Sequence, residues 1–198
     1  VEAEEETWKD LQIFFATSTG NVRRNALSDF TNVKANGKIA MKLPENTTLV
    51  GAQICRSDND VLLTTAKGKA IRFNIDDVRI FKGRDSVGVK GITLKKDDTV
   101  ISMAILKHVE VSTEERLAYF KMRRAITGED NGIENSEEST LVLSQERYVE
   151  LGALEEWILT ITSQGFGKRS SAHEYRRSGR GGQGITSANL ERRKDSII

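Results

Sequence analysis

The chain has 198 residues, an apolar content of 37% and a formal net charge of +1. The length allows one or two domains with a core, and the apolar content is ordinary for a soluble protein. Its single cysteine, Cys55, excludes an intramolecular disulfide and favours a reducing compartment. No apolar stretch approaches the roughly 20 residues that cross a bilayer, and no signal peptide is visible. We therefore expect a cytoplasmic protein that does not contact a membrane.

The near-neutral total conceals segments of opposite charge. Residues 1–10 carry five acids and one lysine and are expected to form a solvated acidic linker. Residues 107–157 carry twelve acids and six bases. The positive excess therefore lies in the rest of the chain, and such a concentration of positive charge is typical of proteins that bind a polyanion.

One sequence pattern occurs three times, at residues 17–24, 65–72 and 162–169. Each copy follows an apolar run, begins Thr-x-x-Gly, and places an arginine four residues after the glycine. A glycine supplies the positive φ that a tight turn needs, and the flanking β-branched and aromatic residues favour strands, so each copy predicts a β-hairpin. The glycines are Gly20, Gly68 and Gly165, and the arginines are Arg24, Arg72 and Arg169.

The segments after each hairpin also correspond. In the first unit a loop leads to an apolar segment at 39–43 and a strand at 49–54. The second unit repeats this order with 92–94 and 100–106, and the loop at 178–184 begins the same order in the third. Four short antiparallel strands are therefore expected in each unit.

The spacing of the turns indicates propeller-type blades with one interruption. Gly20 and Gly68 are 48 residues apart, close to the blade period of about 40–50 residues. Gly68 and Gly165 are 97 apart, which a degenerate blade or an insertion would explain. We favour an insertion, because residues 107–157 lack the repeated pattern.

The insertion is predicted to be partly helical. Ser112 and Glu115 form a capping box ahead of a helix at 113–126, whereas residues 140–152 fit either a strand or a second helix. The predicted division is an acidic linker at 1–10, blades at 11–57 and 58–106, an acidic, partly helical insertion at 107–157, and an incomplete blade at 158–198.

With these repeats the sequence resembles the C-terminal domain of the DNA gyrase A subunit, which is a β-pinwheel of propeller-like blades from bacteria. The resemblance covers about residues 11–106 and 158–190. It implies an all-β fold of blades with four short antiparallel strands, interrupted by the helical insertion. The matching segments are 15–30, 37–43, 68–73 with 88–92, and 165–169 with Glu174 and Tyr175.

One departure concerns the glycine-rich box of that family, which reads Gln, basic, Arg, Gly, Gly, basic, Gly. The stretch at 178–184 keeps Arg180, Gly181, Gly182 and Gly184 but lacks the initial Gln and both flanking bases. We interpret it as the equivalent loop of a later blade, and expect the complete box before Val1. Topoisomerase IV subunits carry similar blades with degenerate boxes, so this relative stays an alternative.

The repeated arginines suggest a surface for duplex DNA. Alternate residues of a strand share a face, so Arg24, Arg72 and Arg169 are expected to form an outward row along one curved rim. The alternative for each is a local ion pair with an acid such as Asp29 or Asp76. Cations suit DNA phosphates, and glycine loops let backbone N–H groups approach them. The predicted DNA-binding residues are Arg23, Arg24, Lys38, Lys69, Arg72, Arg84, Lys90, Lys168, Arg169, Arg176, Arg177, Arg180, Gly181 and Gly182.

The expected contact is sequence-tolerant, because no paired Asn or Gln on a helix suggests base reading. If roughly nine phosphates are neutralised, log K falls against log salt with a slope near −8. The resemblance implies that wrapped DNA is presented for ATP-dependent strand passage and negative supercoiling, with the rest of the A subunit, together with the ATPase B subunit, as partners in an A2B2 enzyme. The rival hypothesis is a protein-interaction scaffold whose basic rim binds an acidic protein.

No catalytic, metal or cofactor site is predicted in this chain, and the resemblance assigns ATP and Mg²⁺ to other parts of the enzyme. Residues 179–184 match G-x-G-x-x-G, but the strand before and the helix after that a dinucleotide site needs are missing. His108, His173 and Cys55 are far apart in sequence, which disfavours a metal or nucleophile site. The tyrosines Tyr119, Tyr148 and Tyr175 have no catalytic context. One hypothesis is that acidic residues 129–138 compete with DNA for the rim.

Overall fold

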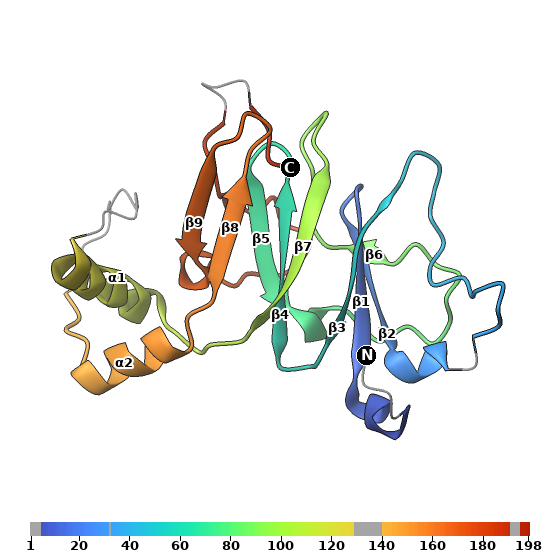
Figure 1. The fold of residues 1–198 in the computed structure, drawn as a ribbon, viewed down its shortest axis with the longest axis horizontal. Coiled ribbons are helices and arrows are strands. Elements are labelled where there is room, and N and C mark those ends of the chain that lie inside the picture. The colour runs from blue at the N-terminus through green and yellow to red at the C-terminus, as the bar shows by residue number, and fades with distance from the viewer. Residues whose placement is uncertain (1–4, 32, 129–139, 191–194) are drawn as a thin grey trace.

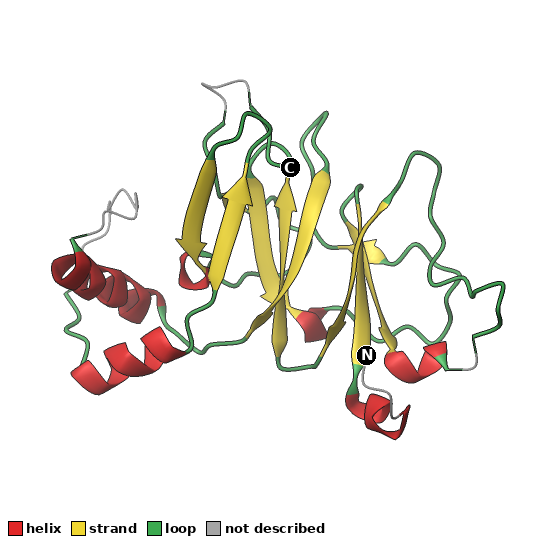
Figure 2. Ribbon diagram, in the orientation of Figure 1, coloured by secondary structure: helices red, strands yellow, loops and turns green. Residues whose placement is uncertain are grey.

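The structure is a computed structural model that describes residues 5–31, 33–128, 140–190 and 195–198. It is built of antiparallel strands with one pair of α-helices, and the sheets lie side by side with the helical pair at one end (Figure 1). The strands are β1 (Gln12–Thr17), β2 (Asn21–Ala26), β3 (Leu49–Cys55), β4 (Asn59–Thr65), β5 (Lys69–Asn74), β6 (Val89–Lys90), β7 (Val100–Lys107), β8 (Trp157–Ile161), β9 (Gly167–Ser171) and β10 (Ile185–Thr186). The helices are α1 (Thr113–Thr127) and α2 (Gln145–Ala153), and short 3-10 turns lie at Glu5–Asp10, Leu27–Phe30, Ile75–Asp77 and Ala172–Glu174 (Figure 2).

The strands form three sheets that exchange short edge strands. The first sheet has the order β3-β1-β2-β6, the second β10-β5-β4-β7, and the third is the hairpin β8-β9. β6 belongs to the loop of the second repeat but pairs with β2, and β10 belongs to the third repeat but pairs with β5. The predicted fold class, blades of four antiparallel strands with a helical insertion, is confirmed. That the fourth strand of the first and second sheets comes from the next repeat was not predicted.

The three predicted hairpins are confirmed, and the structure explains their Thr-x-x-Gly pattern. Each turn glycine has a φ between 81° and 84°, a left-handed conformation that a side chain would strain. The threonine hydroxyl accepts a hydrogen bond of 3.1 to 3.2 Å from the N–H that follows the glycine, so it closes the turn. The acceptors are Thr17, Thr65 and Thr162, and the donors are Asn21, Lys69 and Phe166.

The sheets pack face to face. Phe14 and Val22 of the first sheet lie in one buried cluster with Leu63, Ile71 and Phe73 of the second. A smaller cluster joins the second sheet to the third and contains residues of both sheets and of the turn after β9. We call these contacts the first joint and the second joint. The members of the smaller cluster are Leu62, Ala70, Leu106, Ala172 and Tyr175, with Ala104, Ile158 and Ile185 packed against them.

A glycine immediately precedes each exchanged strand. Gly88 has φ +85° and Gly184 has φ +71°, and a Cβ on them would lie 2.2 Å from the Val22 carbonyl oxygen and 2.3 Å from the Ala70 carbonyl oxygen. Gly37 is the corresponding residue of the first repeat, with φ +80°, but nothing lies within 4 Å of its Cβ position.

The apolar segment at 39–43 forms no strand, because such a short strand needs a neighbouring sheet and none lies beside it in the described structure.

The helical pair occupies the predicted insertion. The Ser112 hydroxyl accepts from Glu115 N and the Glu115 carboxylate accepts from Ser112 N, so the predicted capping box and first helix are confirmed. The second segment is a helix rather than a strand. The two helices share a buried cluster that includes Tyr119, Phe120 and Leu151. The acidic residues at 129–138 that were proposed to compete with DNA lie outside the described residues.

Candidate nucleic-acid interface

Arg24 does not point outward. Its side chain is 6% exposed, and Nη1 lies 2.5 Å from Asp76 Oδ1 and donates to Gln12 Oε1 at 3.1 Å. Asp76 belongs to the second repeat, so the ion pair spans the first joint. The expectation of an outward cation is wrong here. The observed ion pair also differs from the local pair that was the alternative, because Asp76 belongs to the next repeat.

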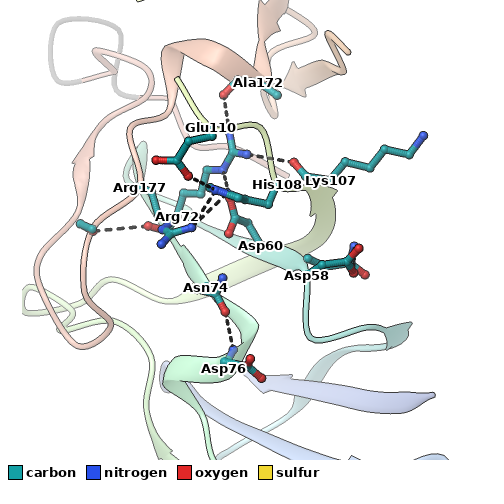
Figure 3. A network of polar contacts seen from close by, with 12 residues as sticks. Asp58, Asp60, Arg72, Asn74, Asp76, Lys107, His108, Glu110, Ala172 and Arg177 are labelled. Atoms are coloured by element: carbon teal, nitrogen blue, oxygen red, sulfur yellow. Dashed lines mark hydrogen bonds and ion pairs between the residues drawn. The ribbon is translucent and has the colours of Figure 1, made fainter. Parts of the chain in front are cut away.

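Arg72 is buried in the same way at the second joint (Figure 3). Its side chain is 7% exposed and donates from Nε to Asp60 Oδ2 at 2.9 Å. Nη1 donates to the Ala172 carbonyl at 2.9 Å, and Nη2 donates to the Lys107 carbonyl at 3.1 Å. These bonds use the guanidinium on three sides, so Arg72 joins the second sheet to the third repeat and is not a free cation.

The pairing register of the strands explains why the repeated arginines do not form the predicted outward row. Each repeated arginine lies opposite an apolar residue of the neighbouring strand, and opposed residues share a face. In the first two sheets that face packs on the next sheet, so the arginine is buried with it. Arg169 is exposed and lies over the Trp157 ring at 4.4 Å. The opposed pairs are Phe14 with Arg24, Leu62 with Arg72, and Leu159 with Arg169.

Arg23 is also a structural residue rather than a surface cation. Its side chain is 1% exposed, donates from Nε to Asn25 Oδ1 at 2.8 Å and from Nη1 to the Ser86 carbonyl at 2.7 Å. The guanidinium carbon lies 4.9 Å from the centre of the Phe81 ring. Burial lowers the pKa of Arg23 below its ordinary value. The prediction that it is available to DNA is therefore corrected.

The glycine-rich loop is a connector between repeats. Gly181 N donates to the Gly91 carbonyl at 2.6 Å, and Thr93 donates from its N to the Gly182 carbonyl. Arg180 donates from Nε to the Asp77 carbonyl and from Nη1 to the Lys90 carbonyl. The Gly181 N–H is thus already used, which corrects the expectation that it is open to a phosphate.

The remaining predicted cations are more accessible. Lys69 and Arg84 are half-buried, and Lys69 Nζ donates to Thr186 Oγ1 at 2.9 Å. Lys168 lies 3.8 Å from the Glu174 carboxylate, and Lys38 donates to the Asp29 carbonyl. The exposed predicted residues are Lys38, Lys90, Lys168, Arg169, Arg176, Arg177, Arg180 and Gly182.

Four of these exposed cations, Lys90, Arg176, Arg177 and Arg180, lie on two segments that end in the edge strands β6 of the first sheet and β10 of the second. We call residues 79–90 and 176–186 the loop edge. Its two halves meet where the Arg180 side chain donates to the Lys90 carbonyl. Arg79 and Lys82 are exposed on the same loop but were not predicted from the sequence. They could have been predicted because they lie in the same loop as Arg84, which was predicted to bind DNA.

Other kinds of site are not found in the described part of the chain. It holds no group of three or more His, Cys, Asp or Glu side chains that could bind a metal ion. None of its helices is long and apolar enough to cross a membrane.

Sheets of four short antiparallel strands that exchange an edge strand with the next repeat define a propeller-like repeat domain. The family model described as "DNA gyrase C-terminal domain, beta-propeller" matches residues 12–56, 59–107 and 156–198, and leaves unmatched the segment that holds α1 and α2. The chain belongs to this family, and the suspected resemblance is confirmed.

Similar proteins include the DNA gyrase A subunit of Granulibacter bethesdensis, 47% identical over 210 residues, and that of Rickettsia bellii, 42% identical over 199 residues. Each comparison covers 98% of this chain, the helical pair included, but the chain spans only 22% of each relative.

Solved structures share the fold. The C-terminal domain of DNA topoisomerase IV matches with a TM-score of 0.65 at 18% identity, covering 95% of this chain and 45% of that one. The E. coli ParC C-terminal domain matches with a TM-score of 0.54 at 15% identity, covering 96% of this chain and 61% of that one.

Proposed function

We propose that this chain binds and wraps duplex DNA without reading its sequence, as part of the C-terminal domain of a DNA gyrase A subunit. The observation that carries the proposal is the composition of the loop edge. It holds seven bases and one acid, Asp85. The bases are Arg79, Lys82, Arg84, Lys90, Arg176, Arg177 and Arg180.

The fold makes the loop edge continuous from one sheet to the next. β6 of the second repeat lies on the first sheet, β10 of the third repeat lies on the second, and Gly181 is hydrogen-bonded beside β6. The cations of successive repeats therefore follow one another along one side. Bending a DNA segment of 20–30 bp by 40–90° costs about 1–6 kcal/mol, which phosphate contacts spread over several sheets can offset.

In the whole enzyme, the wrapped DNA would present a second duplex segment for ATP-dependent strand passage and negative supercoiling. The partners would be the rest of the A subunit, together with the ATPase B subunit, in an A2B2 enzyme in the cytoplasm. ATP and Mg²⁺ would act in those parts, and this chain would contribute no catalytic residue. The equivalent role in topoisomerase IV is the alternative, but the relatives at 47% and 42% identity are gyrase proteins and favour gyrase.

Binding to unrelated duplexes of increasing length tests the proposal. We expect affinities that do not depend on sequence and that rise with length, because a longer duplex reaches more of the loop edge. Seven phosphate contacts give a slope of about −6 for log K against log salt. A protein-interaction scaffold would bind DNA weakly, without a length dependence and with a slope nearer −2.

A matched pair of triple variants separates the loop edge from overall charge. Lys82→Gln, Lys90→Gln and Arg176→Gln together remove three exposed loop-edge cations, and we expect the slope to become shallower by about 3. Lys67→Gln, Lys95→Gln and Lys96→Gln remove the same charge from exposed turns outside the loop edge. Equal losses of affinity in both variants would contradict the assignment of the loop edge.

A further inference from the structure

The second joint has a smaller apolar cluster than the first, because several positions that are large and apolar in the first joint are small or polar in the second. In the first joint Leu63, Ile71 and Phe73 of the second sheet are buried against the first sheet. At the corresponding positions of the third sheet stand Thr160, Lys168 and Ser170, as the two hairpin registers show. Ala188 likewise stands where the first joint has Ile92, since both donate from N to the carbonyl of a turn glycine.

These smaller and polar residues leave space. A groove of about 720 Å³ lies in the second joint, lined by Thr160, Lys168 and Ala188 on the side of the sheets. Arg116, Leu117 and Phe120 of α1 form its other wall. The apolar contact between the second and third sheets is therefore reduced, and a helix stands beside the gap.

The helical pair is fastened to the third repeat. The Tyr119 ring of α1 packs edge-on against His173, with ring centroids 5.6 Å apart. His173 Nε2 lies 3.0 Å from the Leu151 carbonyl oxygen of α2, and Arg116 donates to the Glu174 carbonyl. These contacts involve the turn that follows β9, which Arg72 holds from the other side.

The root of the helical pair is fastened to the second sheet (Figure 3). His108 Nδ1 lies 3.0 Å from the buried Asp60 carboxylate of β4, and its Nε2 lies 2.8 Å from Glu110. Arg147 at the start of α2 donates to the Glu110 carbonyl at 2.7 Å. Arg177 of the third repeat contacts the same His108 ring. The helical pair therefore contacts the third repeat directly and is connected to the second sheet through residues 108–110 at its root.

We propose that α1 and α2 act as a brace that holds the third sheet at a fixed angle to the second, in place of the apolar contacts that this joint lacks. The brace goes beyond DNA binding, and its geometry can be measured without DNA. If the chain wraps DNA, which is a separate proposal, the angle at this joint sets the curvature of the DNA path across it.

Distances between paired spin labels test the brace. One label pair, Ser102→Cys with Leu159→Cys, spans the second joint from exposed strand positions. A control pair, Ser28→Cys with Ser102→Cys, spans the first joint from exposed positions. The native Cys55 remains unlabelled, because it is 2% exposed and burial raises its pKa to about 12.

Replacing residues 112–153 by a short Gly/Ser linker should at least double the width of the distance distribution across the second joint and leave the control pair unchanged. Adding Thr160→Leu, Lys168→Ile and Ser170→Phe to that variant should narrow the distribution again, because these changes restore the residue types of the first joint. If the distance distribution stays broad after these three substitutions, the helical pair does not replace missing apolar contacts, and the proposal is overturned.

Tyr119→Ala in the full chain is the second variant and covers the case in which the linker variant does not fold. It removes the ring that packs against His173 and should broaden the same distribution by a smaller factor. The proposal is overturned if the width across the second joint equals that of the unmodified chain in every folded variant.

Discussion

The Arg24 guanidinium on β2 lies 2.5 Å from the Asp76 carboxylate, an acid of the next repeat. The equivalent arginine of the second sheet, Arg72, reaches the Ala172 carbonyl of the third repeat. In the first and second sheets, the arginine four residues after the turn glycine therefore contacts the next repeat. Arg24 and Arg72 thus connect neighbouring sheets.

We expect Asp76→Ala to lower the free energy of unfolding by about 1–3 kcal/mol, because it leaves the buried guanidinium with the Gln12 oxygen as its remaining hydrogen-bond partner among the described residues. The loss is smaller than the roughly 3–5 kcal/mol typical of a fully buried pair, since the Asp76 side chain is largely exposed. Denaturant unfolding measures it. Asp77→Ala, an exposed neighbouring acid, is the control, and equal losses in both variants would argue against the ion pair.

Arg72→Lys should destabilise the chain by about 2–4 kcal/mol although it keeps the charge. A lysine ammonium cannot reach the Asp60 carboxylate and the carbonyls of Ala172 and Lys107 at once, so buried acceptors lose their donors. Arg176→Lys on the exposed loop edge should change stability by less than about 0.5 kcal/mol. Thermal or denaturant unfolding of both variants compares the two sites, and an Arg72→Lys variant of full stability would show that the fork geometry does not matter.

The glycines that precede the exchanged strands should not tolerate alanine. Gly88→Ala and Gly184→Ala each put a Cβ within 2.3 Å of a carbonyl oxygen at positive φ, so we expect losses above about 3 kcal/mol. Gly37→Ala has the same sign of φ but open space, and should cost only the backbone strain of about 1–2 kcal/mol. Unfolding midpoints of the three variants measure these losses. An equal loss of stability at all three positions would contradict the close contact of Gly88 and Gly184 with the neighbouring carbonyl oxygens.

Glu174 should make stability fall as pH rises. Burial raises the pKa of this carboxyl above its ordinary value of 4.5, while Lys168 opposes the shift. The folded state then holds a proton that the unfolded state has lost, so the free energy of unfolding decreases between pH 4.5 and the higher folded pKa.

Glu174→Gln removes this titration and should flatten stability over that window. Unfolding curves recorded from about pH 4 to 7 compare the two proteins. If Glu174 instead makes the free energy of unfolding increase with pH, and this increase is absent from Glu174→Gln, the pKa of Glu174 is lowered and not raised by folding.

The local features of this fold could be predicted from the sequence. The three hairpins follow from a glycine with positive φ and a threonine that closes the turn, and the capping box at Ser112 marks the start of α1. These signals act within a few residues, so no tertiary contact is needed to read them. The exchanged strands gave no such signal, because β6 and β10 have two residues each and exist only by pairing with another sheet.

Whether the repeated arginine side chains face solvent or the next sheet could not be predicted from local sequence signals. A period of two shows which residues of a strand share a face, but it does not show which face another sheet covers. Phe14 and Leu62, which lie opposite Arg24 and Arg72, were the available signal that this face is buried. Positive charge on the loops was a better guide to the surface, although Arg23 shows that it also misleads.

Arg72 joins two sheets, and we propose that DNA is bound by the loop edge instead. The most direct test of this division measures DNA affinity and unfolding free energy together for Arg72→Met and for the triple variant Lys82→Gln, Lys90→Gln and Arg176→Gln. We predict that Arg72→Met lowers stability by about 2–4 kcal/mol but keeps the DNA dissociation constant within about twofold under conditions where it is folded. The triple variant should raise that constant about tenfold or more with unchanged stability. A stable Arg72→Met protein with a large loss of DNA affinity, beside a triple variant that binds normally, would contradict the account.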